Sequence, residues 1–294
     1  MTGGAGQLGS ALSRLRWPDG WCADPVTRDL LDLEDAAGVR ARFAEGRWDA
    51  VINAAAYTAV DRAEDEPAKA WAVNALGPAI LAECCREAGI PIVQVSTDYV
   101  FPGTKLGAWA VTDPVAPLGV YGASKLGGEL AVGTSGARHA VVRTSWVFSA
   151  QGSNFVKTML RLAADRDTVR VVADQTGGPT AAADLADALA RIVVRLWQDP
   201  AAPSGTYHFA NAGCTNWADF AREIFAQSAA RGGSEAHVEP IATCDFPTRA
   251  TRPANSLLDT SRTSAEFSIF PRPWTEALGE VMDELLGQPE AAGA

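Results

Sequence analysis

Apolar segments that read as strands alternate with amphipathic helices through the first half of this chain of 294 residues. Strands are expected over 49–55, 90–97 and 140–145, and a helix over about 66–88. Such alternation is typical of a parallel sheet that is covered by helices on both faces. We therefore predict an α/β fold with a doubly wound parallel sheet.

A glycine-rich turn, GGAGQLG, opens the chain at residues 3–9. It fits both Gly3-x-x-Gly6-x-x-Gly9 and Gly4-x-Gly6-x-x-Gly9, and either register lets a pyrophosphate approach backbone N–H groups at a helix N-terminus. An ordinary loop explains a lone glycine pattern equally well. With the alternating elements, the turn predicts a Rossmann-like dinucleotide site. The cofactor contacts expected from it are Gly3, Gly6, Gln7, Leu8 and Gly9.

The first strand of such a fold is apparently missing, because only Met1 and Thr2 precede Gly3. A dinucleotide fold needs a strand behind the turn, and unpaired N–H and C=O groups at the centre of a sheet are costly. Either the true start lies upstream or the chain lacks that central strand.

After Pro200 the pattern becomes irregular and rich in Pro and Gly, which suits a smaller lobe of loops and short helices. We predict a dinucleotide-binding domain over 1–148 that also takes in about 169–198, with 169–173 as a sixth strand. The segments 149–168 and 199–294 are expected to form a C-terminal substrate-binding lobe.

The choice of nicotinamide cofactor depends on the end of the expected second strand, Val26-Thr27-Arg28. Thr27 cannot repel a 2′-phosphate and Arg28 could pair with one, so NADPH is favoured, with NADH possible. A solvated loop cation explains Arg28 equally well. The remaining cofactor contacts expected at strand ends are Asp32, Leu33, Ala54, Ala55, Ala56 and Tyr57, although small residues such as these alanines also suit tight packing.

Thr97, Tyr121 and Lys125 can together move a proton onto a carbonyl oxygen. Tyr121 would donate the proton, and Lys125, one helical turn further on, would lower the pKa of the phenol and also hold the ribose of the cofactor. Thr97 would orient the substrate oxygen. Tyr-x-x-x-Lys alone is a common exposed helix pair, but its place after the glycine turn and two buried strands predicts an active site.

The composition excludes several other classes of protein. A formal net charge of −10 argues against a nucleic-acid surface, and no apolar run is long enough to cross a membrane. Five cysteines without a C-x-x-C pair indicate reduced thiols in a cytoplasmic protein, and three scattered histidines suggest no metal site.

At these residues the sequence resembles the extended short-chain dehydrogenases/reductases, and within them the dTDP-4-dehydrorhamnose reductases. The resemblance covers nearly the whole chain. The motifs that carry it are GGAGQLG, VINAAAYTAVDRAE, VQVSTDYVF, YGASKLGGE, VRTSWVF, GSNFVKTML, VVADQTGGPTAAADLA and RPANSLLD.

The resemblance implies reduction of dTDP-4-dehydro-β-L-rhamnose to dTDP-L-rhamnose by NADPH or NADH, with Thr97, Tyr121 and Lys125 in the catalytic positions. It also implies a monomer or homodimer. No magnesium ligands can be matched, so no metal is expected. The substrate-binding residues that it implies are Thr97, Asp98, Tyr99, Trp146, Asn154, Phe155, Gln175 and Arg252, of which Arg252 would meet a phosphate.

Two other functions use the same residues or the same fold. A nucleotide-sugar epimerase or epimerase/reductase would also use Tyr121 and Lys125, but it would hold NAD tightly through its cycle. A non-catalytic regulatory subunit would not need the intact set of Thr97, Tyr121 and Lys125.

Overall fold

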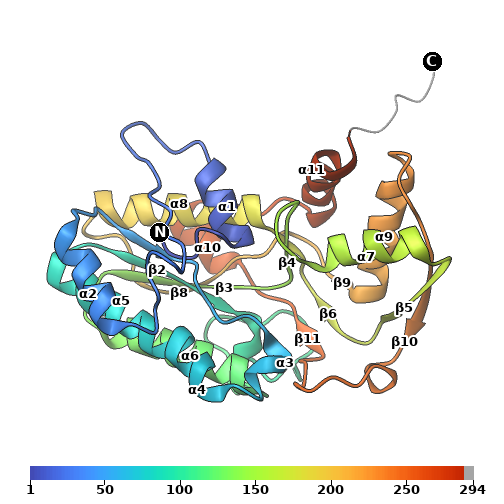
Figure 1. Cartoon of the computed structure of the whole chain (residues 1–294), viewed down its shortest axis with the longest axis horizontal. Helices are drawn as coiled ribbons and strands as arrows, with labels where there is room; N and C mark the ends of the chain where they lie inside the picture. The colour runs from blue at the N-terminus through green and yellow to red at the C-terminus, as the bar shows by residue number, and fades with distance from the viewer. Residues whose placement is uncertain (288–294) are drawn as a thin grey trace.

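The computed structural model describes residues 1–287, which form two lobes (Figure 1). The larger lobe holds a parallel sheet in the order β1-β2-β3-β8. Its strands are β1 (Val51–Asn53), β2 (Ile92–Thr97), β3 (His139–Thr144) and β8 (Gly205–His208). The predicted strands over 49–55, 90–97 and 140–145 are therefore confirmed, with somewhat different bounds.

Helices cover both faces of this sheet, as the alternating pattern predicted (Figure 1). One face carries α1 (Gln7–Arg14), α8 (Ala182–Gln198) and α10 (Ser261–Phe267). The other face carries α2 (Ala36–Glu45), α5 (Gly77–Ala88) and α6 (Val120–Thr134). Leu12, Leu185 and Leu189 fill the core under the first set of helices, and Leu81, Ile92 and Val132 fill the core under the second.

Short elements complete the larger lobe. The predicted helix over 66–88 is a continuous helical stretch that consists of α4 (Pro67–Trp71), the π-helix η1 (Ala72–Leu76) and α5. The other short elements are α3 (Val60–Ala63) and the 3₁₀-helix η2 (Asp98–Val100).

The predicted gap in the sheet is filled by a single residue. Thr2 bridges Val26 on one side and Asn53 on the other, both in parallel orientation. Its N–H donates to Ile52 O at 3.0 Å, and Val26 N donates to Met1 O at 2.8 Å. The Thr2 hydroxyl also bonds Asn53, whose amide donates to Gln94 at 2.7 Å, so side chains continue the connection across the strands.

The smaller lobe contains short strands and three long helices around its own core, which includes Phe148, Phe220, Ile224 and Leu278. Its helices are α7 (Phe155–Asp165), α9 (Trp217–Ala229), α11 (Trp274–Leu286) and the 3₁₀-helix η3 (Thr243–Asp245). Its strands are β4 (Val147–Phe148), β5 (Thr168–Val172), β6 (Thr176–Gly177), β7 (Thr180–Ala181), β9 (Thr215–Asn216), β10 (His237–Ile241) and β11 (Asn255–Ser256).

The sixth strand was assigned to the wrong sheet. Segment 169–173 forms most of β5, which pairs with β10 in the smaller lobe. The fourth strand of the main sheet is β8, which lies within the segment 199–294 predicted for the substrate-binding lobe. The reason is burial. Thr168 and Arg170 are exposed while Val169 and Val171 are buried, so β5 covers a core on one face only. Strands β1 and β2 of the main sheet are buried almost throughout.

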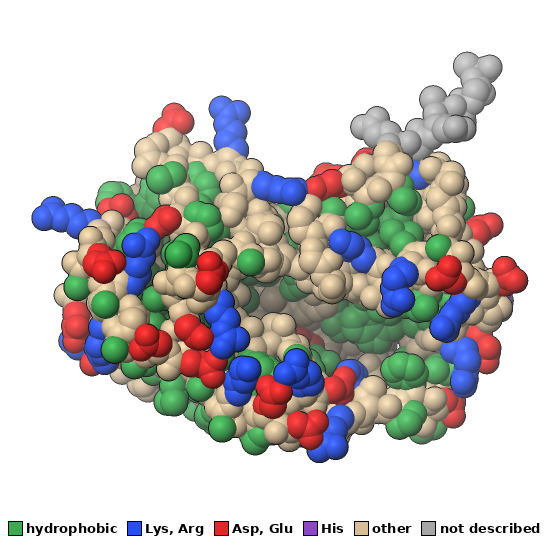
Figure 2. Space-filling model, in the orientation of Figure 1, with side chains coloured by type: hydrophobic (Ala, Val, Ile, Leu, Met, Phe, Trp, Pro, Cys, Tyr) green, Lys and Arg blue, Asp and Glu red, His purple; other side chains and the backbone are tan. Residues whose placement is uncertain are grey.

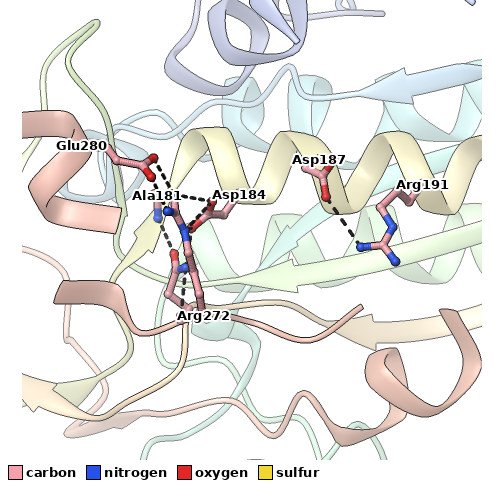
Figure 3. Close-up of polar contacts among 7 residues, drawn as sticks. Ala181, Asp184, Asp187, Arg191, Arg272 and Glu280 are labelled. Atoms are coloured by element: carbon pink, nitrogen blue, oxygen red, sulfur yellow. Dashed lines mark hydrogen bonds and ion pairs between the residues drawn. The ribbon is translucent and has the colours of Figure 1, made fainter. Parts of the chain in front are cut away.

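The lobes are joined at the start of α8 by a polar cluster (Figure 3). Arg272 donates to Asp184 at 2.9 Å and to Glu280 on α11 at 2.6 Å. Asn211 accepts from Ala181 N at 2.8 Å and donates to Asp184 at 2.6 Å. This cluster fixes α11 of the smaller lobe against α8 of the larger one.

Candidate active site

A cavity of about 630 Å³ lies between the lobes at the carboxyl ends of β1, β2 and β3, and Figure 2 shows the hollow on this face. Ligands of open parallel sheets bind at this edge. All the residues predicted to bind the cofactor line the cavity: Gly3, Gly6, Gln7, Leu8, Gly9, Arg28, Asp32, Leu33, Ala54, Ala55, Ala56, Tyr57, Tyr121 and Lys125. Of the substrate set, Thr97, Asp98, Tyr99 and Trp146 line it as well.

The glycine turn is packed too closely for side chains. Gly3 has φ +74°, and a Cβ there would lie 2.7 Å from Ala55 N. A Cβ on Gly9 would lie 2.1 Å from Gly3 O. Helix α1 begins at the cavity without a side-chain cap or an acidic residue in its first turn. Its first N–H groups are therefore available to an anion, and the turn fits a pyrophosphate.

Arg28 lies at the cavity, but two carboxylates already hold it. Its guanidinium bonds Asp32 at 3.1 Å and also bonds Glu34. These hydrogen bonds raise the pKa of Arg28. The pKa of Asp32 is lowered mainly by the hydrogen bond from Glu34 N, and Arg28 lowers it further. The side chain of Arg28 is 62% exposed, so water screens the pairs and a phosphate can compete for the guanidinium.

Asn74, in the π-helix η1, contributes to the site and was not found from the sequence. Its amide donates to Ser124 Oγ on α6 and to Tyr57 O, both at 3.0 Å, and accepts from Tyr57 N at 2.8 Å. It therefore fixes the cavity-lining segment at Tyr57 to the helix that carries Tyr121. No periodicity in the sequence marks a π-helix, although such bulges often occur at functional sites.

Thr97, Tyr121 and Lys125 converge on the cavity from the end of β2 and from α6. Burial raises the pKa of Tyr121 to about 12, and the neighbouring Thr97 hydroxyl lowers it in part. Burial lowers the pKa of Lys125 to about 8, against the charge of Glu129. Lys125 was expected to bring the pKa of Tyr121 below its usual value, and this is wrong for this structure because burial outweighs any such effect. The Lys125 ammonium donates to Val95 O at 2.6 Å.

Asp98 and Tyr99 lie beside this set. Asp98 accepts from the Thr97 hydroxyl at 2.9 Å, while its Oδ2 has no hydrogen-bond partner among the described residues. Burial raises the pKa of Asp98 to about 6, against the hydrogen bond from Thr97. The Tyr99 ring meets the Tyr121 ring edge-on, with centroids 5.5 Å apart.

Trp146 reaches the cavity from just beyond β3 with a φ of +48°, which is unusual for a bulky residue. Its indole stacks on Trp217, with ring centroids 3.6 Å apart. A Cβ on Gly177 would lie 2.7 Å from the indole, so this glycine leaves room for the ring. Thr144 and Ser145, on the same strand end, also line the cavity and were not named from the sequence.

Four predicted substrate residues do not line the cavity. Asn154 donates to Gln7 Oε1 at 2.9 Å and so connects the smaller lobe to the glycine turn. Phe155 packs against Trp217, and the Gln175 amide donates to Thr243 at 3.0 Å. Arg252, predicted to meet a phosphate, instead donates to Asp61 at 2.7 Å.

Two general features of the described residues bear on the type of site. In residues 1–287, no group of three or more His, Cys, Asp or Glu side chains could hold a metal ion. None of the helices in this part of the chain is both long and apolar enough to span a membrane.

A family model described as the RmlD substrate binding domain matches residues 1–286. The dTDP-4-dehydrorhamnose reductase of Aggregatibacter actinomycetemcomitans is 42% identical over 285 residues, which cover 96% of this chain and 97% of that protein. The chain belongs to this family of reductases. The family resemblance inferred from the motifs is confirmed.

Solved structures of the family share the fold. A dTDP-4-dehydrorhamnose reductase from Clostridium acetobutylicum superposes with a TM-score of 0.90 at 36% identity, over 97% of this chain and 98% of that one. The enzyme from Bacillus anthracis, solved in complex with NADP, gives a TM-score of 0.88 at 35% identity over 96% and 97% of the two chains. The predicted Rossmann-like α/β fold is confirmed.

Proposed function

We propose that this chain reduces dTDP-4-dehydro-β-L-rhamnose to dTDP-L-rhamnose with NADPH. The observation that carries the proposal is the convergence of the glycine turn with Thr97, Tyr121 and Lys125 on one cavity, in a member of this reductase family. The related enzyme from Bacillus anthracis was solved with NADP, which supports the choice of cofactor.

The residues of the turn and of the neighbouring strand ends would hold NADPH. The α1 N-terminus and Gly3 would receive the pyrophosphate, and Arg28 would pair with the 2′-phosphate in exchange for Asp32 and Glu34. When bound, NADPH supplies the hydride that reduces the carbonyl carbon. Lys125 would meet the ribose hydroxyls, since its ammonium lies at the cavity beside Val95 O.

Tyr121 would act as the acid. Its phenol stays protonated at neutral pH because burial raises its pKa, so it can donate its proton to the carbonyl oxygen as that oxygen gains negative charge. Thr97 would hydrogen-bond the same oxygen and orient it. The resulting tyrosinate would be stabilised by the neighbouring Lys125 ammonium.

The smaller lobe would bind the nucleotide-sugar. Trp146 would pack against the hexose, with Asp98 and Tyr99 beside it, and Arg252 would release Asp61 to meet a phosphate. Asn154, Phe155 and Gln175 would support that surface from behind. On this basis we assign residues 1–146, α8, β8 and α10 to the cofactor domain. Most of the remaining described chain, including β4 and β5, is assigned to substrate binding.

We further infer a cytoplasmic enzyme, because all five cysteines are free. A monomer or homodimer is what the family resemblance implies. The position of Cys84 and Cys85 in the core of the larger lobe is compatible with a reducing compartment, since buried thiols there need no partner.

The test is turnover of the purified protein with dTDP-4-dehydro-rhamnose and NADPH, followed by absorbance and by identification of the product. We expect one dTDP-L-rhamnose per NADPH consumed. Isolation of the protein with tightly bound NAD, and interconversion of sugar epimers without net consumption of NADPH, would instead show an epimerase. If neither reduction nor epimerisation is observed, a non-catalytic subunit would be favoured.

A further inference from the structure

A buried ion pair lies directly behind the candidate catalytic residues. The carboxylate of Glu129 on α6 accepts two hydrogen bonds from the Arg143 guanidinium on β3, at 2.9 and 2.7 Å. The two side chains are 5% and 6% exposed, and within residues 1–287 no other ion pair has both side chains below a tenth. Burying two charges is expensive, so such a pair needs a physical reason.

The pair is attached to the two strand ends that carry the site. Glu129 also accepts from the Ser96 hydroxyl, and Ser96 and Arg143 are direct partners in the β2–β3 register. The next partners in that register are Thr97 and Thr144, which both line the cavity. One carboxylate therefore holds Ser96 and Arg143, the register pair next to Thr97 and Thr144, and Ser96 lines the cavity too.

Glu129 stands one helical turn after Lys125 on α6, and both side chains are buried. A buried ammonium loses hydration, and burial lowers the pKa of Lys125 to about 8, close to the pH at which the enzyme must work. Of the surrounding charges, that of Glu129 raises it. The other titratable groups on or against this part of α6 include Tyr121, Glu64 at the helix start, Asp98 and Tyr99 on η2, and Arg143 on β3.

We propose that Glu129 is a positioning residue that supplies the counter-charge keeping Lys125 an ammonium beside Tyr121, and that Arg143 and Ser96 hold the Glu129 side chain in place. The inference rests on the proposed function, in which Lys125 acts as a cation. Three hydrogen bonds, two from Arg143 and one from Ser96, fix the Glu129 carboxylate behind Lys125. His208, beside Arg143, adds no charge, because burial lowers its pKa to about 3.

The titration of Lys125 can be measured directly in the ligand-free protein. The chain has only four lysines, Lys69, Lys105, Lys125 and Lys157, so protein labelled with ¹³C at the lysine ε-carbons gives few NMR signals. A Lys125→Met variant assigns the signal. For the wild type we expect a midpoint near the value of about 8 that burial and Glu129 together set.

Glu129→Gln should lower the midpoint of Lys125 by ~1–3 pH units, the range for loss of a close opposite charge. Because this variant leaves Arg143 unpaired and can unfold, the double variant Glu129→Gln/Arg143→Met provides a neutral replacement. It should also titrate below the wild type, but less so, since no unpaired guanidinium remains. Glu83→Gln, which breaks an exposed pair with Arg40, is the matched control and should leave Lys125 unchanged.

The titration needs neither NADPH nor sugar, so its outcome is independent of the turnover assay. If Glu129→Gln and the double variant both titrate like the wild type, the inference is wrong even when the enzyme is active. In an active enzyme, the alkaline limb of the kcat profile should also move to lower pH in Glu129→Gln. A fixed limb together with an unchanged titration would leave Glu129 a purely structural residue.

Discussion

Tyr121 and Lys125 lie one turn apart on α6, and burial moves their pKa values in opposite directions, up to about 12 and down to about 8. At neutral pH the site therefore holds a protonated phenol beside a lysine whose pKa lies near 8. A protonated phenol is the state that a reduction needs, because the carbonyl oxygen must receive a proton. The lysine matters most after that transfer, when it faces a tyrosinate.

Removing the Tyr121 hydroxyl tests this assignment. Tyr121→Phe should lower kcat by ~10²–10⁴-fold, the usual contribution of a general acid, and leave the dissociation constant of NADPH nearly unchanged. Tyr207→Phe removes another buried hydroxyl, one that donates to Pro203 O at 3.0 Å outside the cavity. It should reduce stability and leave kcat intact. Wild-type kcat in Tyr121→Phe would assign the proton to another group.

Arg28 tests the cofactor preference. Arg28→Gln should raise the KM for NADPH by roughly tenfold, because a charge-assisted bond to the 2′-phosphate is lost, and should leave the KM for NADH unchanged. Arg40→Gln, which also breaks an exposed pair with a glutamate, should affect neither. Equal effects of Arg28→Gln on both cofactors would mean that the pairs with Asp32 and Glu34 are only structural.

Among the elements, the glycine turn and α1 form one rigid unit with the end of β1. Gly3 packs against the backbone of Ala54 and Ala55, and Gly9 packs against Gly3 O. The position of the α1 N–H groups therefore depends on contacts that admit no side chain.

Gly9→Ala should lower the thermal midpoint and weaken NADPH binding at least tenfold, since overpacking of this kind costs ~1–3 kcal/mol. Gly133→Ala, near the end of α6, is the control because a Cβ there meets nothing within 4 Å. It should raise stability by ~0.5–1 kcal/mol, the usual gain for alanine over glycine in a helix. If Gly9→Ala binds NADPH like the wild type, the turn does not hold the pyrophosphate.

At the scale of the whole molecule, the sheet depends on a histidine that stays neutral. His208 on β8 is fully buried, its ring lies edge-on to Phe101, and its Nδ1 has no partner among the described residues. Burial, and then the charge of Arg143, lower its pKa from 6.5 to about 3. Between these values the unfolded chain binds a proton that the folded chain does not, so stability falls as pH falls through this window.

His208→Gln should therefore remove part of the acid sensitivity. Between pH ~7.5 and pH ~5 the wild type should lose about 2 kcal/mol more unfolding free energy than the variant in urea titrations. The pKa of Asp98 is raised to about 6, so its protonation below that pH adds to the unfolding free energy. This contribution is the same in both proteins and cancels when they are compared. His237→Gln, at an exposed histidine, should behave like the wild type. An identical loss in His208→Gln and the wild type would contradict the assignment.

The sequence predicted the layers of the fold and the residues that line the cavity better than it predicted which strands pair with one another. Alternation located β1, β2 and β3, and the expected cofactor residues all reach one cavity, because parallel strands end at the same edge. Their roles stay predictions. The partner of β5 could not be predicted, because it depends on where the chain returns after leaving the main sheet. The alternation of exposed and buried residues over 168–171 does indicate a strand with one buried face.

Charge pairs were the other limit of the sequence. Arg28 and Arg252 were read as free cations, yet Asp32, Glu34 and Asp61 hold them in the structure. Asp61 stands 191 positions before Arg252, so no local pattern connects the two. The predicted direction of the pKa shift of Tyr121 was wrong for the same reason. Burial of the phenol, and the hydrogen bond that the Lys125 ammonium donates to Val95 O, exist only in the folded chain.

The π-helix between α4 and α5 gives this fold a dependence on length as well as on residue type. A π-helical turn holds one residue more than an α-helical turn, and that extra residue lets Asn74 reach both Tyr57 and Ser124. Deleting a single residue from 72–76 would close this wide turn into an ordinary α-helical one and leave a good helix. A substitution of Asn74 would remove its hydrogen bonds but keep the wide turn, whereas a one-codon deletion would remove the turn that carries Asn74 between the Tyr57 segment and the helix that carries Tyr121.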